Sequence, residues 1–193
     1  VRIYDSSEIG VLQAGFNEMM RGLRERQRVS DLFGRYVGTE VARRALEEKP
    51  ELGGESRYVA VLFVDVIGST GFATERDPEY VVKALNEFFD RVVEGVHRNK
   101  GIINKFEGDA ALAVFGAPLP LDDVAGHALA AARELHEELK DLEFEAGIGV
   151  AAGSVVAGHI GARDRFEYTV IGDAVNQAAR LTDLAKKTPG RVL

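Results

Sequence analysis

Two aspartates and a turn of small residues are the first candidates for chemistry in this sequence. Asp65 stands at the end of an apolar run that starts at Val59. Three small residues follow it almost at once: Gly68, Ser69 and Thr70. A carboxylate at the end of a buried strand is costly unless something pairs with it, and a turn of small residues offers backbone N–H groups to an anion. A carboxylate beside such a turn indicates a divalent metal that holds phosphates.

The second aspartate, Asp109, follows Gly108 in a turn between two short apolar runs. Alone, it is typical of an ordinary hairpin. If the strand that ends at Asp65 lies beside this hairpin, however, both carboxylates converge on one edge of the sheet. Two carboxylates that close repel each other unless a cation lies between them. Two-metal sites use this arrangement in phosphoryl and nucleotidyl transfer.

The segments around these residues alternate between strands and helices. The patterns predict strands at 57–66, 102–107, 110–115, 144–151, 155–160 and 168–171. They predict helices at 77–100, from Asp122 or Asp123 to 139, and at 173–187. We expect a hairpin turn at Gly153-Ser154 and a polar excursion at 162–166. This order predicts an α+β fold, a ferredoxin-like βαββαβ sandwich with a mixed or antiparallel sheet and helices on one face.

The first 56 residues differ from the rest. Residues 1–30 are predicted to form a helix with an apolar seam, which consists of Ile9, Leu12, Phe16, Met19 and Leu23. One helix cannot bury such a seam, so it should pair with a copy of itself or with other helices. Residues 31–56 are predicted to be a helical linker, with a short helix at 40–48 and a Gly-containing connection at 51–56. The third region, 57–193, then forms a domain of its own.

Composition excludes several classes of function. The net charge of −7 and the pI near 5.2 argue against binding a nucleic acid polymer, which needs a basic face. The chain has no cysteine, so disulfides, thiolate metal sites and cysteine nucleophiles are excluded. No apolar run approaches the roughly 20 residues that span a bilayer, and no signal peptide is visible. Because the chain starts at Val1 and ends in the first residues of an apparent strand, we expect a fragment of a longer protein.

Three segments together resemble the signature blocks of the class III nucleotidyl cyclases. They are FVDVIGST (63–70), NKFEGDAALAVFG (104–116) and YTVIGDAVNQAARL (168–181), in the order of the family. A fourth segment, SSEIGVLQAGFNEMM (6–20), resembles the second helix of a HAMP signalling module. HAMP modules in this family connect membrane helices or sensors to the catalytic domain. The resemblance therefore implies a cytoplasmic catalytic portion whose parent protein is anchored to the inner membrane by segments upstream.

The resemblance implies a metal and phosphate site. Asp65 and Asp109 match the two metal-binding aspartates, and the backbone carbonyl of Val66 matches a further ligand. Two Mg²⁺ or Mn²⁺ ions per site are implied. The turn at Gly68, Ser69 and Thr70 matches the one that wraps the triphosphate.

The resemblance also implies a base and ribose site. Lys105 matches the lysine that reads adenine, and Thr169 stands where many adenylyl cyclases have an aspartate that pairs with it. Asn176 and Arg180 match the pair that orients the ribose and stabilises the charge of the transition state. They are four residues apart on one helix and so share a face. The family forms dimers, so a homodimer would build shared sites from the metal set of one subunit and the base set of the other.

Three features depart from the family pattern. A threonine hydroxyl at Thr169 both accepts and donates hydrogen bonds, which weakens the expected discrimination against guanine. One branch of the family, including bicarbonate-responsive members, has threonine here. Ser154 stands where some members have an arginine that contacts phosphate, and a late phosphate-binding lysine would lie beyond Leu193.

The sequence thus predicts an adenylate cyclase that converts ATP to 3′,5′-cyclic AMP and pyrophosphate as a homodimer. One alternative keeps the fold with GTP or both nucleotides as substrate. Another is a catalytically weak dimer that binds nucleotide or transmits helix motion. A diguanylate cyclase is disfavoured, because the turn 107–110 reads EGDA and not the Gly-Gly-Asp/Glu-Glu-Phe of that class.

Overall fold

The computed structural model describes residues 8–47 and 51–193, except for the side chains of Glu8, Glu47 and Thr70. The chain divides into two compact units, Val1–Lys49 and Pro50–Leu193. The first seven residues of the predicted HAMP-like helix lie outside the described residues.

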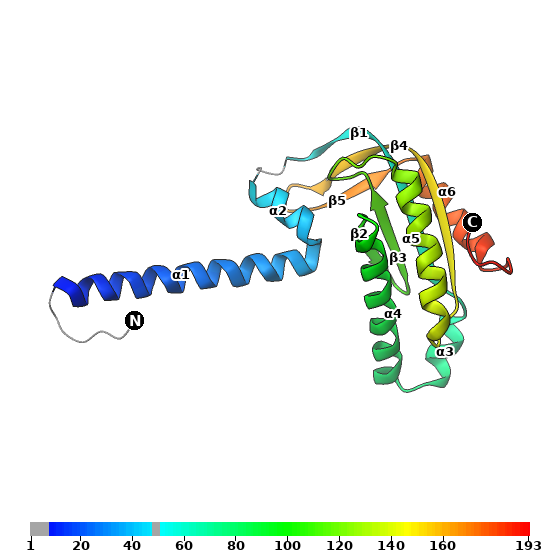
Figure 1. Cartoon of the computed structure of the whole chain (residues 1–193), viewed down its shortest axis with the longest axis horizontal. Helices are drawn as coiled ribbons and strands as arrows, with labels where there is room; N and C mark the ends of the chain where they lie inside the picture. The colour runs from blue at the N-terminus through cyan, green and yellow to red at the C-terminus, as the bar shows by residue number, and fades with distance from the viewer. Residues whose placement is uncertain (1–7, 48–50) are drawn as a thin grey trace. The chain divides into compact units, whose positions relative to one another are not determined.

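The first unit consists of two helices, α1 (Glu8–Val37) and α2 (Thr39–Glu47), which are separated by Gly38 (Figure 1). The positive φ of 89° at Gly38 suits glycine, which ends α1 without a Cβ penalty. Helix α1 therefore continues seven residues past the point where the sequence pattern placed its end. The apolar seam of α1 is exposed, with Leu12 74% and Phe16 46% accessible. In the described part of the chain, no helix is both long and apolar enough to cross a bilayer.

The second unit is built on one five-stranded sheet. Its strands are β1 (Gly53–Val66), β2 (Ile102–Glu107), β3 (Ala110–Phe115), β4 (Ala146–Ala162) and β5 (Arg165–Ile171). They lie in the order β2-β3-β1-β4-β5, and every neighbouring pair is antiparallel. The order β2-β3-β1-β4 is that of a ferredoxin-like βαββαβ unit, and β5 extends it. The α+β fold with an antiparallel sheet is therefore confirmed.

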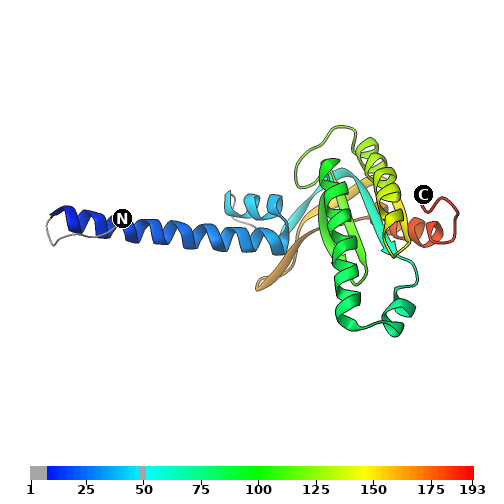
Figure 2. The ribbon, with the colours of Figure 1, turned by 60° about the horizontal axis from the view of Figure 1, so that its bottom comes forward.

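Four helices and a short 3₁₀ turn complete this unit. They are α3 (Ser69–Glu75), α4 (Pro78–Arg98), α5 (Val124–Glu138), η1 (Leu139–Asp141) and α6 (Asp173–Ala185). Helices α4 and α5 lie side by side over one face of the sheet (Figures 1 and 2). Their apolar residues pack against Leu62 and Val64 of β1, whereas Ala174 and Ala178 of α6 pack against Val59 and Val61. Alternate residues of β1 point to opposite faces, so the prediction that all helices cover one face is wrong.

Strand β4 corrects the predicted hairpin at Gly153-Ser154. It runs unbroken for 17 residues and pairs with β1 from Gly53↔His159 to Val66↔Ala146. The same ladder makes 53–56 part of β1, where a linker was expected. Gly153 and Ser154 do not interrupt the strand, because the ladder with β1 continues through both residues, as Val59↔Gly153 and Tyr58↔Ser154. The C-terminal residues also join β4, because Leu193 N–H donates to Ile148 O (3.0 Å) and Ile148 N–H donates to Arg191 O (2.8 Å).

Two glycines of β4 allow α6 to approach the sheet closely. A Cβ on Gly149 would lie 2.3 Å from the carbonyl oxygen of Ala178 and 2.4 Å from the amide nitrogen of Thr182. A Cβ on Gly147 would lie 2.8 Å from the carbonyl oxygen of Thr182. These are backbone atoms, which cannot move aside as a flexible side chain does. The position of α6, and of every residue it carries, therefore depends on these glycines.

This packing predicts a large effect for Gly149→Ala. The added methyl group must push α6 away from β4, which should lower the free energy of unfolding by about 1–3 kcal/mol, the usual cost of overpacking. Urea denaturation followed by circular dichroism measures it. Gly153→Ala is the matched control on the same strand, because its Cβ would meet only the Cβ of Ala174 at 3.4 Å. Equal destabilisation by both variants would contradict the role of close packing.

Candidate functional site

The structure brings the two predicted metal-binding aspartates to adjoining positions. Asp65 is the last residue but one of β1 and pairs with Ala110 of β3. Asp109 immediately precedes Ala110, in the turn that joins β2 to β3. Both side chains are partly exposed. The register between β1 and β3 aligns the end of β1 with the β2–β3 turn, and this alignment brings Asp65 and Asp109 to the same edge of the sheet.

Lys186 is a further charged residue at this position, and sequence reasoning missed it. Its Nζ lies 2.5 Å from Oδ2 of Asp65, and the two side chains are each 24% exposed. Lys186 directly follows α6, and its Cγ would be 2.6 Å from a Cβ on Gly147. The glycine thus makes room for the lysine stem. In the sequence, Lys186 resembles one of the cations common at a helix C-terminus, and its partner depends on tertiary packing.

The donor set around Asp65 suits a hard divalent cation. Asp65 already attracts a cation, the ammonium of Lys186. Val66 follows it with a side chain only 2% exposed, which holds the local backbone and its carbonyl in place. Among the described residues, no group of three or more His, Cys, Asp or Glu side chains gathers. A metal here would therefore depend on two carboxylates and a carbonyl, with water or phosphate oxygens for the rest, as Mg²⁺ usually does.

The predicted phosphate turn leads from β1 into α3. Gly68 has a φ of 74°, and its carbonyl accepts the first helical hydrogen bond, from Phe72 N–H (3.1 Å). The amides at 69–71 precede that bond, so the helix itself provides no acceptor for them. Ser69 is the first residue of α3, and the side chain of Thr70 lies outside the described residues. The turn therefore presents N–H groups, as an anion site requires.

Aromatic and ionic contacts fix α3 against the segment before β4. The ring of Phe72 packs edge-on against Phe144, with centroids 4.5 Å apart. Arg76 lies over Phe72, 4.7 Å from the centroid, and contacts Glu143 at 3.4 Å. Tyr80 O–H also donates a hydrogen bond to Glu143, which raises the pKa of the Tyr80 phenol. These contacts hold the end of the phosphate turn to the segment before β4.

The predicted base-reading residues form a second cluster. Lys105 lies on β2 and Thr169 on β5, which are the two outer strands of the sheet. Lys105 Nζ is nevertheless 2.5 Å from Oε1 of Glu167, and Thr169 Oγ1 is 3.0 Å from Oδ1 of Asn104. The sheet must therefore curl until its outer strands meet. Asn104 and Glu167 are members of this cluster that the sequence reasoning did not single out.

Asn176 and Arg180 lie on the exposed face of α6. Both are exposed, whereas Ala174 and Ala178 on the opposite face of the helix are buried. Within the described residues, neither side chain makes a hydrogen bond or ion pair, and no such contact joins Asp65 or Asp109 to Lys105 or Thr169. The predicted site residues therefore form three groups in one chain: the acidic pair with the phosphate turn that follows β1, the base cluster, and the α6 pair.

Ser154 lies inside β4, opposite Tyr58 of β1, and not in a turn. The expected equivalence with a turn arginine that contacts phosphate thus has no turn to support it here.

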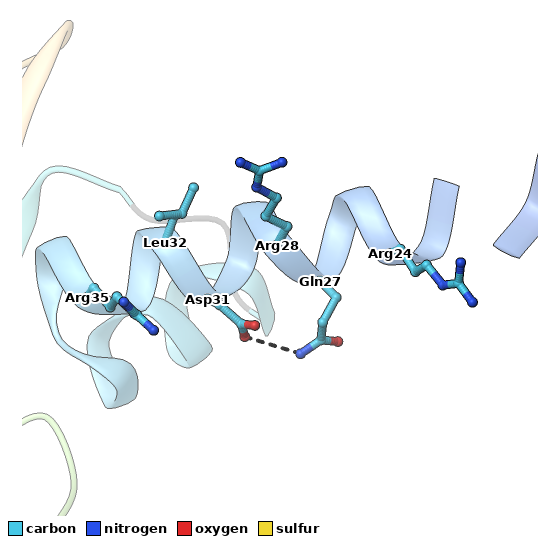
Figure 3. A pocket seen from close by; sticks show the side chains of 6 residues that line it. All are labelled: Arg24, Gln27, Arg28, Asp31, Leu32 and Arg35. Carbon is cyan, nitrogen blue, oxygen red and sulfur yellow. Dashed lines mark hydrogen bonds between the residues drawn. The ribbon is translucent and has the colours of Figure 1, made fainter. Parts of the chain in front are cut away.

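A surface hollow lies along α1, remote from all of these residues in the sequence. Figure 3 shows the side chains that line it: Arg24, Gln27, Arg28, Asp31, Leu32 and Arg35. Gln27 Nε2 donates a hydrogen bond to Asp31 Oδ1 (3.2 Å). All six belong to one helix, and none is a predicted site residue.

Comparisons with known proteins show to which family the second unit is similar. The family model of the adenylate and guanylate cyclase catalytic domain matches residues 54–192. The uncharacterized protein Rv1318c of Mycobacterium tuberculosis strain H37Rv is 58% identical over 193 residues, which are 99% of this chain and 36% of that protein. The chain thus spans about a third of the length of this curated relative.

Two solved structures show the same fold. The guanylyl cyclase Cya2 is 34% identical, with a TM-score of 0.60 over 69% of this chain and 73% of that one. The adenylyl cyclase CyaB from P. aeruginosa is 26% identical, with a TM-score of 0.65 over 69% and 74%. Neighbours of both specificities occur. The acidic pair, the phosphate turn and the family match together identify residues 54–192 as a member of the adenylate and guanylate cyclase catalytic domain family.

Proposed function

We propose that the chain is the catalytic portion of an adenylate cyclase, which converts ATP to 3′,5′-cyclic AMP and pyrophosphate. The observation that carries this choice of base is the cluster of Lys105 and Thr169, which come from opposite edges of the sheet. A lysine ammonium only donates hydrogen bonds, so it suits N1 of adenine, which only accepts. In guanine, N1 carries a proton and is itself a donor. It would therefore face the Lys105 ammonium donor to donor, and no hydrogen bond could form.

Two Mg²⁺ or Mn²⁺ ions held by Asp65, Asp109 and the carbonyl of Val66 would lower the pKa of the ribose 3′-hydroxyl and neutralise charge on the phosphates. The chain's own groups do the positioning. The amides of the turn at Gly68 bind the triphosphate, and Lys105 and Thr169 hold the base. Asn176 orients the ribose so that its 3′ oxygen lies in line with the α-phosphorus.

Arg180 stabilises the charge that develops on the α-phosphate as pyrophosphate leaves. A guanidinium stays protonated and grips two phosphate oxygens at once, which suits this task better than lysine. Its exposed position on α6 leaves it accessible to a nucleotide. The reaction joins two parts of one molecule, so positioning and charge stabilisation supply most of the rate.

Among the described residues, no hydrogen bond or ion pair joins the acidic pair to the base cluster, which supports a homodimer with shared sites. Each subunit would contribute Asp65 and Asp109 to one site, and Lys105, Thr169, Asn176 and Arg180 to the other. One chain carries both sets, so two copies build two sites.

The alternative with GTP, or with both nucleotides, as substrate rests on the 34% identity to the guanylyl cyclase Cya2. Under this alternative the same acidic pair and phosphate turn act on a different base.

The first test is cyclic nucleotide formation from Mn-ATP, with the chain extended beyond Leu193 as in its longer relatives. We expect cyclic AMP from ATP and little cyclic GMP from GTP, measured by mass spectrometry. Asp65→Ala should reduce the rate by about 100-fold or more, the scale for losing charge stabilisation of a transition state. Cyclic AMP no higher than in Asp65→Ala would refute the proposal, and cyclic GMP as the main product would favour the alternative.

The second test concerns Lys186. Lys186→Met keeps an unbranched side chain beside Gly147 but removes the ammonium that competes with a metal for Asp65. We expect Mn²⁺ to bind up to about fivefold more tightly without nucleotide, given the 0.2–1 kcal/mol of a partly exposed ion pair. Titration followed by electron paramagnetic resonance of free Mn²⁺ measures the affinity. Lys187→Met, at an exposed neighbouring lysine, is the control and should change nothing. Unchanged or weaker binding in Lys186→Met would exclude this competition.

We further propose that α1 pairs with a second copy through its exposed seam and so regulates how the subunits close, downstream of a membrane-anchored sensor. Leu12 and Phe16 are exposed apolar residues with no charge between them on that face. Such a stripe on a 30-residue helix needs a partner.

The third test places a charge in the seam. Leu12→Glu should weaken the dimer and change cyclase activity while leaving the site residues intact, because a charge cannot be buried at a seam position. Light scattering and cyclase assays follow the two effects. Arg21→Glu changes the charge on the opposite side of α1 and serves as control. If Leu12→Glu changes neither the molecular mass measured by light scattering nor the cyclase kinetics, α1 is not coupled to the catalytic unit.

A further inference from the structure

We propose that Asn104 is a positioning residue that makes Thr169 a pure hydrogen-bond acceptor and thereby sets the preference for adenine. The inference rests on the proposed function, in which Lys105 and Thr169 face the base. A lone threonine hydroxyl would leave the choice between adenine and guanine open, because it donates and accepts equally well. The contacts of Asn104 remove that freedom.

The orientation of the Asn104 amide follows from one backbone carbonyl. Asn104 Nδ2 lies 2.9 Å from the carbonyl oxygen of Tyr168. A carbonyl oxygen only accepts, so the NH₂ group must face it; the flipped amide would put two oxygens against each other. The amide oxygen of Asn104 therefore points to the other neighbour, Thr169.

The orientation of the Thr169 hydroxyl follows in turn. Thr169 Oγ1 lies 3.0 Å from Oδ1 of Asn104. Because that oxygen only accepts, Thr169 must donate its single proton to it. Thr169 is only 6% exposed, so little water is available to compete for this proton. Toward any ligand, the hydroxyl then offers lone pairs alone.

A β-bulge explains how Asn104 and Lys105 both reach β5. In the ladder between β2 and β3, Ile103 pairs with Ala113 and Lys105 with Leu112, so Asn104 is an extra residue with no partner of its own. Regular alternation would send the side chains of 104 and 105 to opposite faces, and a bulge breaks that alternation. Asn104 contacts Tyr168 and Thr169 of β5. Lys105 contacts Glu167, which lies on β5 two residues before Thr169.

The resulting polarity matches adenine at two positions. The 6-amino group of adenine donates to the Thr169 lone pair, and N1 accepts from the Lys105 ammonium. Guanine and hypoxanthine have a carbonyl at position 6 and N1–H, so acceptor meets acceptor and donor meets donor. Buried polar groups that are mispaired cost binding more than a simple missing contact does. Asn104 thus turns an ambiguous residue into an adenine reader.

Asn104→Ala frees the Thr169 hydroxyl to rotate and donate to a 6-carbonyl. We expect the preference for ATP over ITP to fall by about 10-fold or more, the scale of one repaired buried hydrogen bond. ITP is the sharper probe, because it differs from ATP only at position 6 and the proton on N1. Binding of nonhydrolysable ATP and ITP analogues is measured by calorimetry, alongside kcat/KM for both nucleotides. Binding tests this inference even if the chain has no cyclase activity, so failure of the proposed function is seen separately.

Two further variants distinguish positioning from a general structural role. Asn104→Asp keeps an oxygen toward Thr169 and should retain the ATP preference, although it loses the bond to Tyr168 O. Thr169→Val removes the hydroxyl, so adding Asn104→Ala to it should leave the ATP to ITP ratio where Thr169→Val puts it. Unfolding curves check that each variant is folded. The proposal would be overturned if folded Asn104→Ala kept the preference for ATP over ITP unchanged. It would also be overturned if adding Asn104→Ala to Thr169→Val lowered this preference as much as Asn104→Ala does alone.

Discussion

The ion pair between Asp65 and Lys186 is the interaction on which the packing of the second unit depends. A carboxylate that is three-quarters buried at a strand end needs a cation, and here the chain provides one at 2.5 Å. To do so, α6 must end beside β4, which is possible because Gly147 and Gly149 have no side chain at the contact. The same approach positions Asn176 and Arg180 on α6. A single electrostatic requirement at the end of β1 thus connects the packing of a helix with the placement of residues far along the chain.

The curl of the sheet is the second constraint. Hydrogen bonding makes β2 and β5 the outer strands, yet their side chains meet through Asn104, Lys105 and Glu167. Sheets twist because L-residues favour a right-handed strand twist, and bulges increase it locally. The bulge at Asn104 lies at the point of contact. A flat sheet of the same order would keep the predicted base-reading residues about four strand spacings apart, roughly 19 Å.

Local patterns were sufficient to predict much of this unit. The apolar runs gave β2 and β3 with their observed bounds, and Asp77-Pro78 marked the start of α4, where Asp77 accepts a hydrogen bond from Glu79 N–H. Errors arose where a neighbour decides the structure. Gly153-Ser154 looks like a turn, but the ladder with β1 runs through it and continues before and after it. This pairing keeps the segment extended. The placement of α6 on the second face depends on the close approach at Gly149, which no periodicity reveals.

The same distinction applies to the site. Asp65, Asp109, Lys105, Asn176 and Arg180 could be predicted as site residues because their types and spacing resemble those of a family. Lys186 and Asn104 were missed because neither is unusual in sequence: one looks like a helix-end cation, the other like a polar residue in an edge strand. Their importance comes from partners 121 and 65 positions away.

Under the proposed function, the choice of base depends on which atoms hold protons, and not on shape alone. Thr169 by itself has no fixed polarity, and a sequence can specify only that a hydroxyl is present. The carbonyl of Tyr168 fixes the orientation of the Asn104 amide, and the amide oxygen fixes the orientation of the Thr169 hydroxyl. The backbone of β5 therefore determines that Thr169 acts as an acceptor. A backbone carbonyl cannot change its hydrogen-bonding character by mutation. An enzyme that takes its base preference from such a chain of hydrogen bonds can use an uncharged threonine where an aspartate would otherwise be needed. It thereby avoids the cost of burying a carboxylate at position 169, which is only 6% exposed.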